Sequence, residues 1–480
     1  MKTPAIPNLA TRWSVLLTAI LLGACSSTAP YQAPDLQSDH LTTLPSASAV
    51  EALASDTSLA LWWTQLGDEQ LDALVQLAWK NNYDLRASVA RLASSREQVQ
   101  AAQGARLPGV TLGAEASHVR LAAVESRSGV ASIADPVQWQ ASMAWELDLF
   151  GRVSHSIDAA QFSADERAAL SDDVRRAILA QVVESYLELR GAQMLAANIR
   201  QQLDVQEETL TLIRARERAG SVAPAERIRY EGQLRLFGSR LPGLHAQERT
   251  ARNRLATLTG QRLDAHMLAQ LDRPVPLQLP KALVTDEPAS LLLRRPDVRA
   301  AERAMAVAAA REGIAQADLF PRVSLLSMLG GAGIAGDWLG SEAGRWRLGA
   351  GFSLPLLDGG ARRAQVRAAG ADMQVASANF DKVVAVALEE TDSALSNWAQ
   401  TRKRNADLNT AHNLTQESAR LTRIRYQEGA ESLLGVLEAD RAALAANEQV
   451  VLAQRDLALA TARCYVAMAG GLDIAQVAKP

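Results

Sequence analysis

The stretch Pro136 to Arg152, PVQWQASMAWELDLFGR, alternates between apolar and polar side chains almost without error. One set of alternate positions carries Val137, Trp139, Ala141, Met143, Trp145, Leu147 and Leu149, and the other carries Gln138, Gln140, Ser142, Glu146 and Asp148. A repeat of two residues predicts a β-strand with one buried face. The flanking chain is rich in Ala, Arg, Glu and Leu and predicts long helices, so the sequence nearby offers no sheet for this strand to join.

The first 25 residues have the features of a bacterial export signal. Basic residues precede the apolar run Trp13 to Leu22, which is too short to cross a hydrocarbon layer of roughly 30 Å as a helix. The run leads into LGAC (Leu22 to Cys25), which resembles the lipobox of bacterial lipoproteins. We therefore expect cleavage after residue 24 and a diacylglycerol group on Cys25. By resemblance to bacterial lipoproteins, Ser26 rather than Asp at the next position favours transfer to the outer membrane.

Composition argues against an enzyme and against a nucleic-acid-binding protein. The formal net charge is −3, so no basic excess is available for a phosphate backbone. The six histidines and two cysteines form no cluster with metal-ligand spacing, and no GxSxG, Walker A or GxGxxG signature occurs. We predict no catalytic residue, no cofactor and no metal site. Cys464 lies in a helical Ala/Leu pattern and is expected to be a buried thiol.

One pattern occurs twice in the chain. Residues 84–112 align without a gap on residues 297–325, from Asp84 on Asp297 to Pro108 on Pro321, which is an offset of 213. This internal tandem repeat divides the chain into a signal peptide (1–24), a lipidated N-terminal segment (25–65), a first repeat (66–272), a linker (273–288), a second repeat (289–472) and a C-terminal tail (473–480).

Each repeat has the same predicted order: a helix, two strands, a long helix, a turn and a returning helix. The strands are expected at about 108–119, 137–149, 321–329 and 345–357, and the helical hairpins at about 151–260 and 359–470. Between Gly151 and Gly220 there is no proline, so a helix there could reach about 100 Å at 1.5 Å per residue. Its narrow apolar stripe predicts side-by-side helix packing. The stripe consists of Val174, Ile178, Val182, Tyr186 and Leu189.

The predicted strands favour a membrane. Two-stranded hairpins are marginally stable alone and four strands cannot close a barrel, so apolar side chains and strand edges would be left in water. A bilayer covers the apolar face, and closure with further chains pairs the edges. Two chains supply eight strands and a filled interior, whereas three supply twelve and a water-filled interior, which the polar faces favour. The alternative is a sheet packed on soluble helices.

On this interpretation the two strand faces have different surroundings. The predicted lipid-facing residues are Trp139, Trp145, Trp346 and Phe352. The predicted lumen-lining residues are Gln138, Gln140, Glu146, Asp148, Arg345 and Arg347. Glu146 and Asp148 have the spacing of a paired carboxylate on one strand face, but no nucleophile or histidine partner is near in sequence. We interpret them as lining charges rather than as an acid–base pair.

Four segments carry a family resemblance. They are RLPGLHAQERTARNRLATLTG (Arg240 to Gly260), LLLRRPDVRAAE (Leu291 to Glu302), ADLFPRVSLL (Ala317 to Leu326) and LPLLDGG (Leu354 to Gly360). Together they resemble the outer-membrane efflux lipoproteins of the TolC superfamily that serve resistance-nodulation-division pumps, over nearly all of the mature chain. The resemblance implies an α+β membrane protein with a trimeric twelve-stranded β-barrel, four strands per chain, continuous with a long periplasmic α-helical barrel and a mixed equatorial region.

The resemblance also implies a function and partners. It implies a homotrimer anchored by lipid in the outer membrane of a Gram-negative bacterium and extending into the periplasm. The trimer would dock to a periplasmic adaptor protein and an inner-membrane resistance-nodulation-division transporter, and would passively conduct drugs or other small toxic compounds to the outside. No cofactor is implied, and the lipid on Cys25 would be the attached group.

The two helix turns are the remaining candidate sites. Gly220 and Gly429 are expected to break the helices where the chain reverses, and Ser221 and Ser432 to cap the returning helices. By resemblance these turns are also the adaptor-docking tips. The docking residues would be Ala219, Gly220, Ser221, Val222, Gly429, Ala430, Glu431 and Ser432.

By resemblance, Tyr426, Glu431 and Glu438 would form the periplasmic aperture or gate. The chain departs from the family pattern at Gly435, where another acid is often found, and at Glu431, where some members carry a basic residue. The departures argue against a salt-bridged lock. Three copies of Glu438 around a narrow axis would repel one another and attract cations.

Two further hypotheses remain compatible with the sequence. The same fold could export metal ions or a secreted polypeptide, although His118, His155, His245 and His412 are dispersed. The chain could instead be a periplasmic coiled-coil structural lipoprotein. That hypothesis leaves the amphipathic strands unexplained.

Overall fold

The computed structural model describes residues 31–34, 61–124, 129–260, 265–273, 275, 294–334 and 343–469. The signal peptide, Cys25 and the predicted C-terminal tail lie outside these residues, as does almost all of the predicted linker. The chain forms two compact units. The first contains Arg91–Ala168 and Ala300–Asp381, and the second contains Ala169–Arg299 and Lys382–Pro480 together with Asp35–Ala90.

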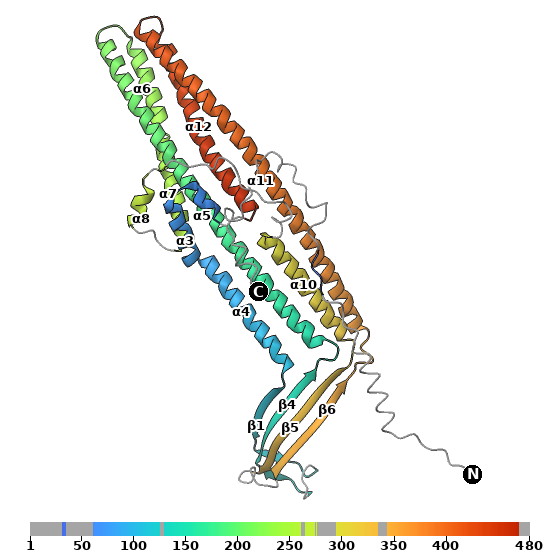
Figure 1. Ribbon diagram of the computed structural model, residues 1–480. Coiled ribbons are helices and arrows are strands. Elements are labelled where there is room, and N and C mark those ends of the chain that lie inside the picture. The colour runs from blue at the N-terminus through green and yellow to red at the C-terminus, as the bar shows by residue number, and fades with distance from the viewer. Residues whose placement is uncertain are drawn as a thin grey trace, which may run out of the picture. The chain divides into compact units, whose positions relative to one another are not determined.

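The first unit contains one four-stranded antiparallel sheet (Figure 1). Its strands, in sheet order, are β1 (Gly109–Ala116), β4 (Pro136–Leu147), β5 (Arg322–Ile334) and β6 (Gly344–Ser353). The short strands β2 (Val119–Leu121) and β3 (Ser132–Ala134) form a separate two-stranded sheet. The strands expected in the two repeats are therefore joined, because β4 of the first repeat pairs with β5 of the second.

The strand register separates the apolar from the polar side chains. Residues directly opposite in an antiparallel pair point to the same face. Trp145 lies opposite Leu325, which lies opposite Ala350, and Leu329 lies opposite Trp346. Trp139, Trp145, Trp346 and Phe352 thus share one face, on which Trp346 is 78% and Phe352 67% exposed. Gln138, Gln140, Glu146, Arg345 and Arg347 share the other. The alternation predicted for residues 136–147 is confirmed, whereas β5 departs from it by placing Leu326 and Met328 on the face of the polar residues.

Helices make up most of the remaining described chain. They are η3 (Trp62–Leu66), α3 (Glu69–Asn81), α4 (Tyr83–Gln103), η4 (Gly104–Arg106), α5 (Arg152–Arg218), α6 (Pro224–Gly238), α7 (Leu241–Leu258), α8 (Ala265–Leu271), α10 (Pro296–Ala317), α11 (Ala361–Gln427) and α12 (Leu433–Ala467). The arm that returns after α5 is divided into α6 and α7, because Pro242 in the first turn of α7 lacks the N–H that a continuous helix needs. Within the described residues, none of these helices combines the length and hydropathy that a membrane crossing requires.

The second unit has an apolar core around α5 and α12. Ile178, Val182, Tyr186 and Leu189 of the predicted stripe are buried in it, and Val174 packs against it. The indole ring of Trp62 stacks on the ring of Tyr465 with 5.2 Å between centroids. Cys464 is fully buried as predicted, and burial raises the pKa of its thiol to about 12. The narrow stripe of α5 therefore packs against neighbouring helices, as expected from its width.

The β4–β5 pairing depends on glycine at one position. A Cβ atom on Gly330 would lie 2.4 Å from the backbone oxygen of Trp139, whereas a Cβ atom on Gly349 of β6 would meet nothing within 4 Å. We expect Gly330→Ala to force the two strands apart and to cost about 1–3 kcal/mol, and Gly349→Ala to have little effect. Thermal unfolding of the two variants in detergent tests this. Equal unfolding temperatures would contradict the predicted close approach.

Candidate functional site

The two long helices end in the same backbone motif. Gly220 and Gly429 have φ angles of 74° and 78°, a left-handed conformation that glycine adopts without strain. At the first turn, Ser221 N donates to Arg216 O at 2.9 Å and Gly220 N to Glu217 O at 2.9 Å. The same bonds recur at the second turn. This pattern is the Schellman motif, which satisfies helix-terminal carbonyl groups. The predicted helix breaks at both glycines are confirmed.

The returning helices begin differently. Ser432 caps α12, because its Oγ accepts a hydrogen bond from Gly435 N at 3.1 Å, as predicted. The prediction that Ser221 caps α6 is wrong. The N-cap of α6 is Ala223, which makes no side-chain cap, and Pro224 is in the first turn. Proline is suited to the first helical position because its missing N–H would have no helical partner there.

The three predicted gate residues have separate contacts. Tyr426 is half-buried, and the guanidinium carbon of Arg216 lies 4.5 Å from its ring centroid. Glu431 turns back on its own loop, where Oε1 accepts from Ser432 N at 3.0 Å and Oε2 lies 3.8 Å from Arg425 Nη2. Glu438 is exposed, and the described residues supply no ion pair for it. A cation–π contact thus links α5 to α11 at the tips.

Glu431 also occupies the space beside Gly435. A Cβ atom on Gly435 would come within 2.6 Å of the Glu431 Oε1 atom. Glycine at 435 therefore gives room to the carboxylate at 431, so the two departures from the family pattern are sterically linked. The role of Arg216 could not be read from the sequence, because Arg216 and Tyr426 lie on different helices.

Asp440 of α12 is a buried acid that the sequence did not single out. It is 9% exposed, and its Oδ1 atom lies 2.8 Å from Arg423 Nη2 of α11. Burial raises the pKa of this carboxyl despite the attraction of Arg423. Tyr230 of α6 is buried nearby, and both residues line an open groove of about 490 Å³ beside α12. The groove also contains apolar side chains, namely Leu236, Phe237, Leu437 and Leu444.

Two of the predicted lumen-lining carboxylates have partners where β4 leads into α5. Glu146 accepts from Arg152 Nε at 2.8 Å and Nη2 at 2.7 Å. Asp148 follows β4, and its oxygens accept from Val153 N at 2.9 Å and Ser154 N at 2.8 Å. The carboxylate of Asp148 therefore binds the N-terminal end of α5, where the helix dipole favours negative charge. Strand alternation alone did not reveal this contact.

A chain of hydrogen bonds crosses the polar sheet face near the end of the sheet where β1 ends and β4 and β6 begin. Gln138 Nε2 donates to Glu115 Oε2 at 2.8 Å, and Arg345 Nη2 donates to Gln138 Oε1 at 3.3 Å. The Arg345 side chain reaches from β6 to β4 across β5, where Gly330 and Ala332 lie at the corresponding positions of this face. Small residues on β5 thus allow polar side chains of the outer strands to meet above it.

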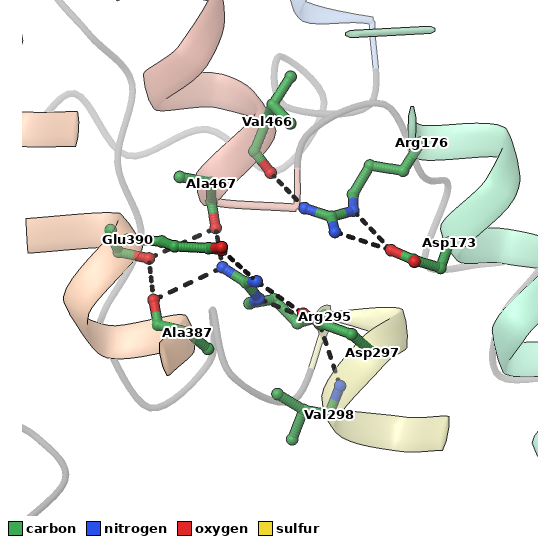
Figure 2. A network of polar contacts seen from close by, with 10 residues as sticks. Asp173, Arg176, Arg295, Asp297, Val298, Ala387, Glu390, Val466 and Ala467 are labelled. Carbon is green, nitrogen blue, oxygen red and sulfur yellow. Dashed lines mark hydrogen bonds and ion pairs between the residues drawn. The ribbon is translucent and has the colours of Figure 1, made fainter. Parts of the chain in front are cut away.

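A buried arginine network closes the end of α12 (Figure 2). Arg295, whose side chain is 2% exposed, donates to Ala467 O at 3.2 Å and contacts Glu390 Oε2 at 2.7 Å and Asp297 Oδ2 at 2.6 Å. Arg176 donates to Val466 O at 3.1 Å. Two cations therefore lie at the carbonyl end of α12, where the helix dipole favours positive charge.

The network also lowers the pKa of Asp297, the acid beside Arg295. Burial would raise the pKa of Asp297, but hydrogen bonds and the charge of Arg295 hold that pKa below its ordinary value. Asp297 is consequently a stable anion at neutral pH. Both residues belong to the RRPD motif (residues 294–297), one of the segments that carry the family resemblance. The structure adds a role for it, namely closure of the second helical hairpin at its base.

The sequence model of the family described as "Outer membrane efflux protein" matches residues 74–261 and 288–470. Outer membrane protein OprJ of Pseudomonas aeruginosa is 30% identical over 470 residues, which cover 96% of each chain. Nodulation protein T of Rhizobium leguminosarum bv. trifolii is 27% identical over 469 residues, covering 96% of this chain and 98% of that protein. The solved structure of the outer-membrane channel OprN superposes with a TM-score of 0.84 at 31% identity, over 93% of this chain and 99% of the other.

Removal of the buried guanidinium at position 295 provides a test of the network. We expect Arg295→Met to destabilise the second unit by about 3–5 kcal/mol, because it leaves buried carboxylates and carbonyl groups without their partner. Arg420→Met, which removes an exposed ion pair with Glu417, should change stability little. Urea unfolding, monitored by circular dichroism, compares the stability of the two variants. Similar midpoints for the two variants would show that the network does not stabilise the fold.

Proposed function

Because the chain belongs to the outer membrane efflux protein family, we propose that it is the outer-membrane exit duct of a tripartite efflux pump. It conducts drugs or other small toxic compounds passively, and it is not an enzyme. The observation that carries this proposal is the four-stranded sheet with one apolar and one polar face. Such a sheet fits a wall between lipid and water, and a wall of this kind in the outer membrane is a pore.

The sheet edges support closure by identical chains. β1 and β6 are the terminal strands of the four-stranded sheet, so in the described chain each has one edge without a strand partner. An even number of antiparallel strands makes β1 and β6 run in opposite directions, so β6 of one copy can pair antiparallel with β1 of the next. Three copies give twelve strands and a water-filled lumen. In this trimer the predicted lipid-facing residues face the bilayer, and Gln138, Gln140, Arg345 and Arg347 face the lumen.

The helical parts are assigned by the same proposal to the periplasm. The long helices form an α-helical barrel below a mixed equatorial region, and a lipid on Cys25 tethers the chain to the outer membrane. The turns at 219–222 and 429–432 dock to a periplasmic adaptor protein, which connects the duct to an inner-membrane resistance-nodulation-division transporter. Tyr426, held by Arg216, and the exposed Glu438 control the aperture. The hypothesis of a periplasmic coiled-coil lipoprotein leaves the exposed apolar sheet face without a partner.

The protein mass of the detergent-extracted outer-membrane species tests the assembly. We expect three chains per particle. Cys25→Ala, processed through an ordinary signal peptide, should lose the lipid mass and the firm tether that acyl chains provide. A particle of one chain would overturn the barrel and with it the lipid-facing assignment of Trp139 and Trp145.

If the tips dock the adaptor, a change at a tip should abolish drug export without preventing trimer formation. Gly429→Pro cannot adopt the positive φ of residue 429 and lacks the N–H that bonds to Tyr426 O at 3.1 Å. We expect the variant to form trimers and to lose drug export, measured as drug accumulation in cells that supply the adaptor and transporter. Gly232→Ala, in a helix position where a Cβ atom meets nothing within 4 Å, is the control. Loss of the trimer in Gly429→Pro would count against the tip assignment.

A further inference from the structure

The polar face of the four-stranded sheet carries two arginines that the rest of the face does not neutralise. Arg345 and Arg347 are two residues apart on β6, so their side chains leave the same face of the strand roughly 7 Å apart. Arg345 has only the neutral amide of Gln138 as a hydrogen-bond partner on the described strands. Arg347 is exposed, and the described part of the chain supplies it with neither an ion pair nor a hydrogen bond.

The other charged side chains of this face are either paired with an opposite charge or outnumbered by the two arginines. Glu146 is paired with Arg152, and Arg322 of β5 is paired with Asp318 at 2.7 Å. Glu115 is the remaining carboxylate of the described strands on this face. Glu115 carries one negative charge, and Arg345 and Arg347 carry two positive charges. Each chain therefore has one positive charge in excess on this face, whichever arginine Glu115 approaches in an assembled barrel. Neighbouring like charges are unfavourable unless an anion joins them.

An apolar patch adjoins the two arginines on the same face. Met328 of β5 lies directly opposite Arg347, and Leu326 is the next β5 residue on this face. Leu326 is 45% exposed on this face, which it shares with the polar side chains of β4 and β6. Its Cδ1 atom lies over Gly351 of β6, where a Cβ atom would come within 3.3 Å. The surface at Gly349 is open, because a Cβ atom there would meet nothing within 4 Å.

We propose that Arg345, Arg347, Met328 and Leu326 form a binding site for small amphiphilic anions. The guanidinium groups bind a carboxylate, sulfate or sulfonate group, which matches the planar donor geometry of arginine. Met328 and Leu326 contact the apolar body of the same molecule. The inference rests on the proposed function, because the assembled barrel is what turns this face toward a water-filled lumen. Its consequence is that the duct retains anionic amphiphiles on their way out more strongly than cationic ones.

Two probes with the same apolar body and opposite charge test the site. Naphthalene-2-sulfonate and 2-naphthylmethylammonium are titrated into the full-length trimer in phosphatidylcholine nanodiscs, with empty nanodiscs as the blank for partition into lipid. We expect the sulfonate to bind about tenfold more tightly than the ammonium. The preference should weaken in 0.5 M NaCl, because salt screens charge interactions over distances beyond about 3–5 Å at such concentrations.

Variants identify the groups responsible. Arg345→Gln combined with Arg347→Gln should remove the preference for the sulfonate, and Arg347→Lys should retain much of it. Leu326→Ser should weaken both probes alike, because it removes part of the apolar contact. Arg363→Gln, which removes an exposed cation at the start of α11, is the matched control and should leave binding unchanged. Equal binding of the two probes, or a preference that survives in the double variant, would overturn the site.

Separate measurements report whether the anion site alone is missing or whether the duct itself does not form. Mass measurement of the same nanodisc sample reports the number of chains, and planar-bilayer recording reports whether the particle conducts ions. A single-chain particle would refute the duct and the lumenal site together. A conducting trimer that binds both naphthalene probes equally would refute the site alone. Within a conducting trimer, the reversal potential in a KCl gradient should move toward cation selectivity in the double variant.

Discussion

The structure depends on the antiparallel pairing of β4 with β5, which joins strands from the two halves of the chain. Residues from Pro136 to Leu147 are paired in register with residues from Val323 to Ile334. A slip of one residue would move every side chain of one strand to the other face, so the pairing also decides which β5 residues share a face with Trp139 and Trp145 and which share a face with Gln138 and Gln140. Gly330 permits the close approach of the strands at Trp139. An amphipathic sheet of four strands is the result.

In the second unit, buried polar contacts join helices that are far apart in the sequence. Arg295 precedes α10 and binds the carbonyl end of α12, and Asn82 precedes α4 and donates to Leu258 O of α7 at 2.9 Å. The two residues are 213 positions apart, which is the offset at which residues 84–112 align with residues 297–325. In each half of the chain, one polar side chain therefore ties the end of the returning helix to the start of the first helix. The second half uses a cation with two carboxylates, and the first uses a neutral amide.

The tips show how similar backbone turns can carry different side-chain chemistry. Both turns have a glycine with positive φ and the same pair of hydrogen bonds. Around them, Tyr426 is held by the guanidinium of Arg216, while Glu431 is held by its own loop beside Gly435. The contact between α5 and α11 at the tips is a cation–π contact, and the ion pair of Glu431 is with Arg425 at the same turn.

Several features could be predicted from the sequence, because each depends on local periodicity or on the conformational preference of one residue. They are the strand alternation of β4, the two helix-breaking glycines, the cap at Ser432 and the buried Cys464. The site residues that the sequence missed, Arg216, Arg295 and Asp440, act through partners on other helices. The same limit applies to Asp148, which alternation placed on a strand face and which binds the start of α5. Ser221 was misassigned as a cap because Pro224 determines where α6 begins.

By itself, the sequence determined the amphipathic strands, the long helices and the resemblance to a family of efflux channels. Only the tertiary structure decided that the strands of both halves form one sheet, which residues are neighbours on its polar face, and that Arg345 and Arg347 lie beside Met328 and Leu326. The physical reason is that periodicity along a chain specifies which face a side chain is on. The neighbours across that face are set by strand register and by side chains brought together from positions far apart in the sequence.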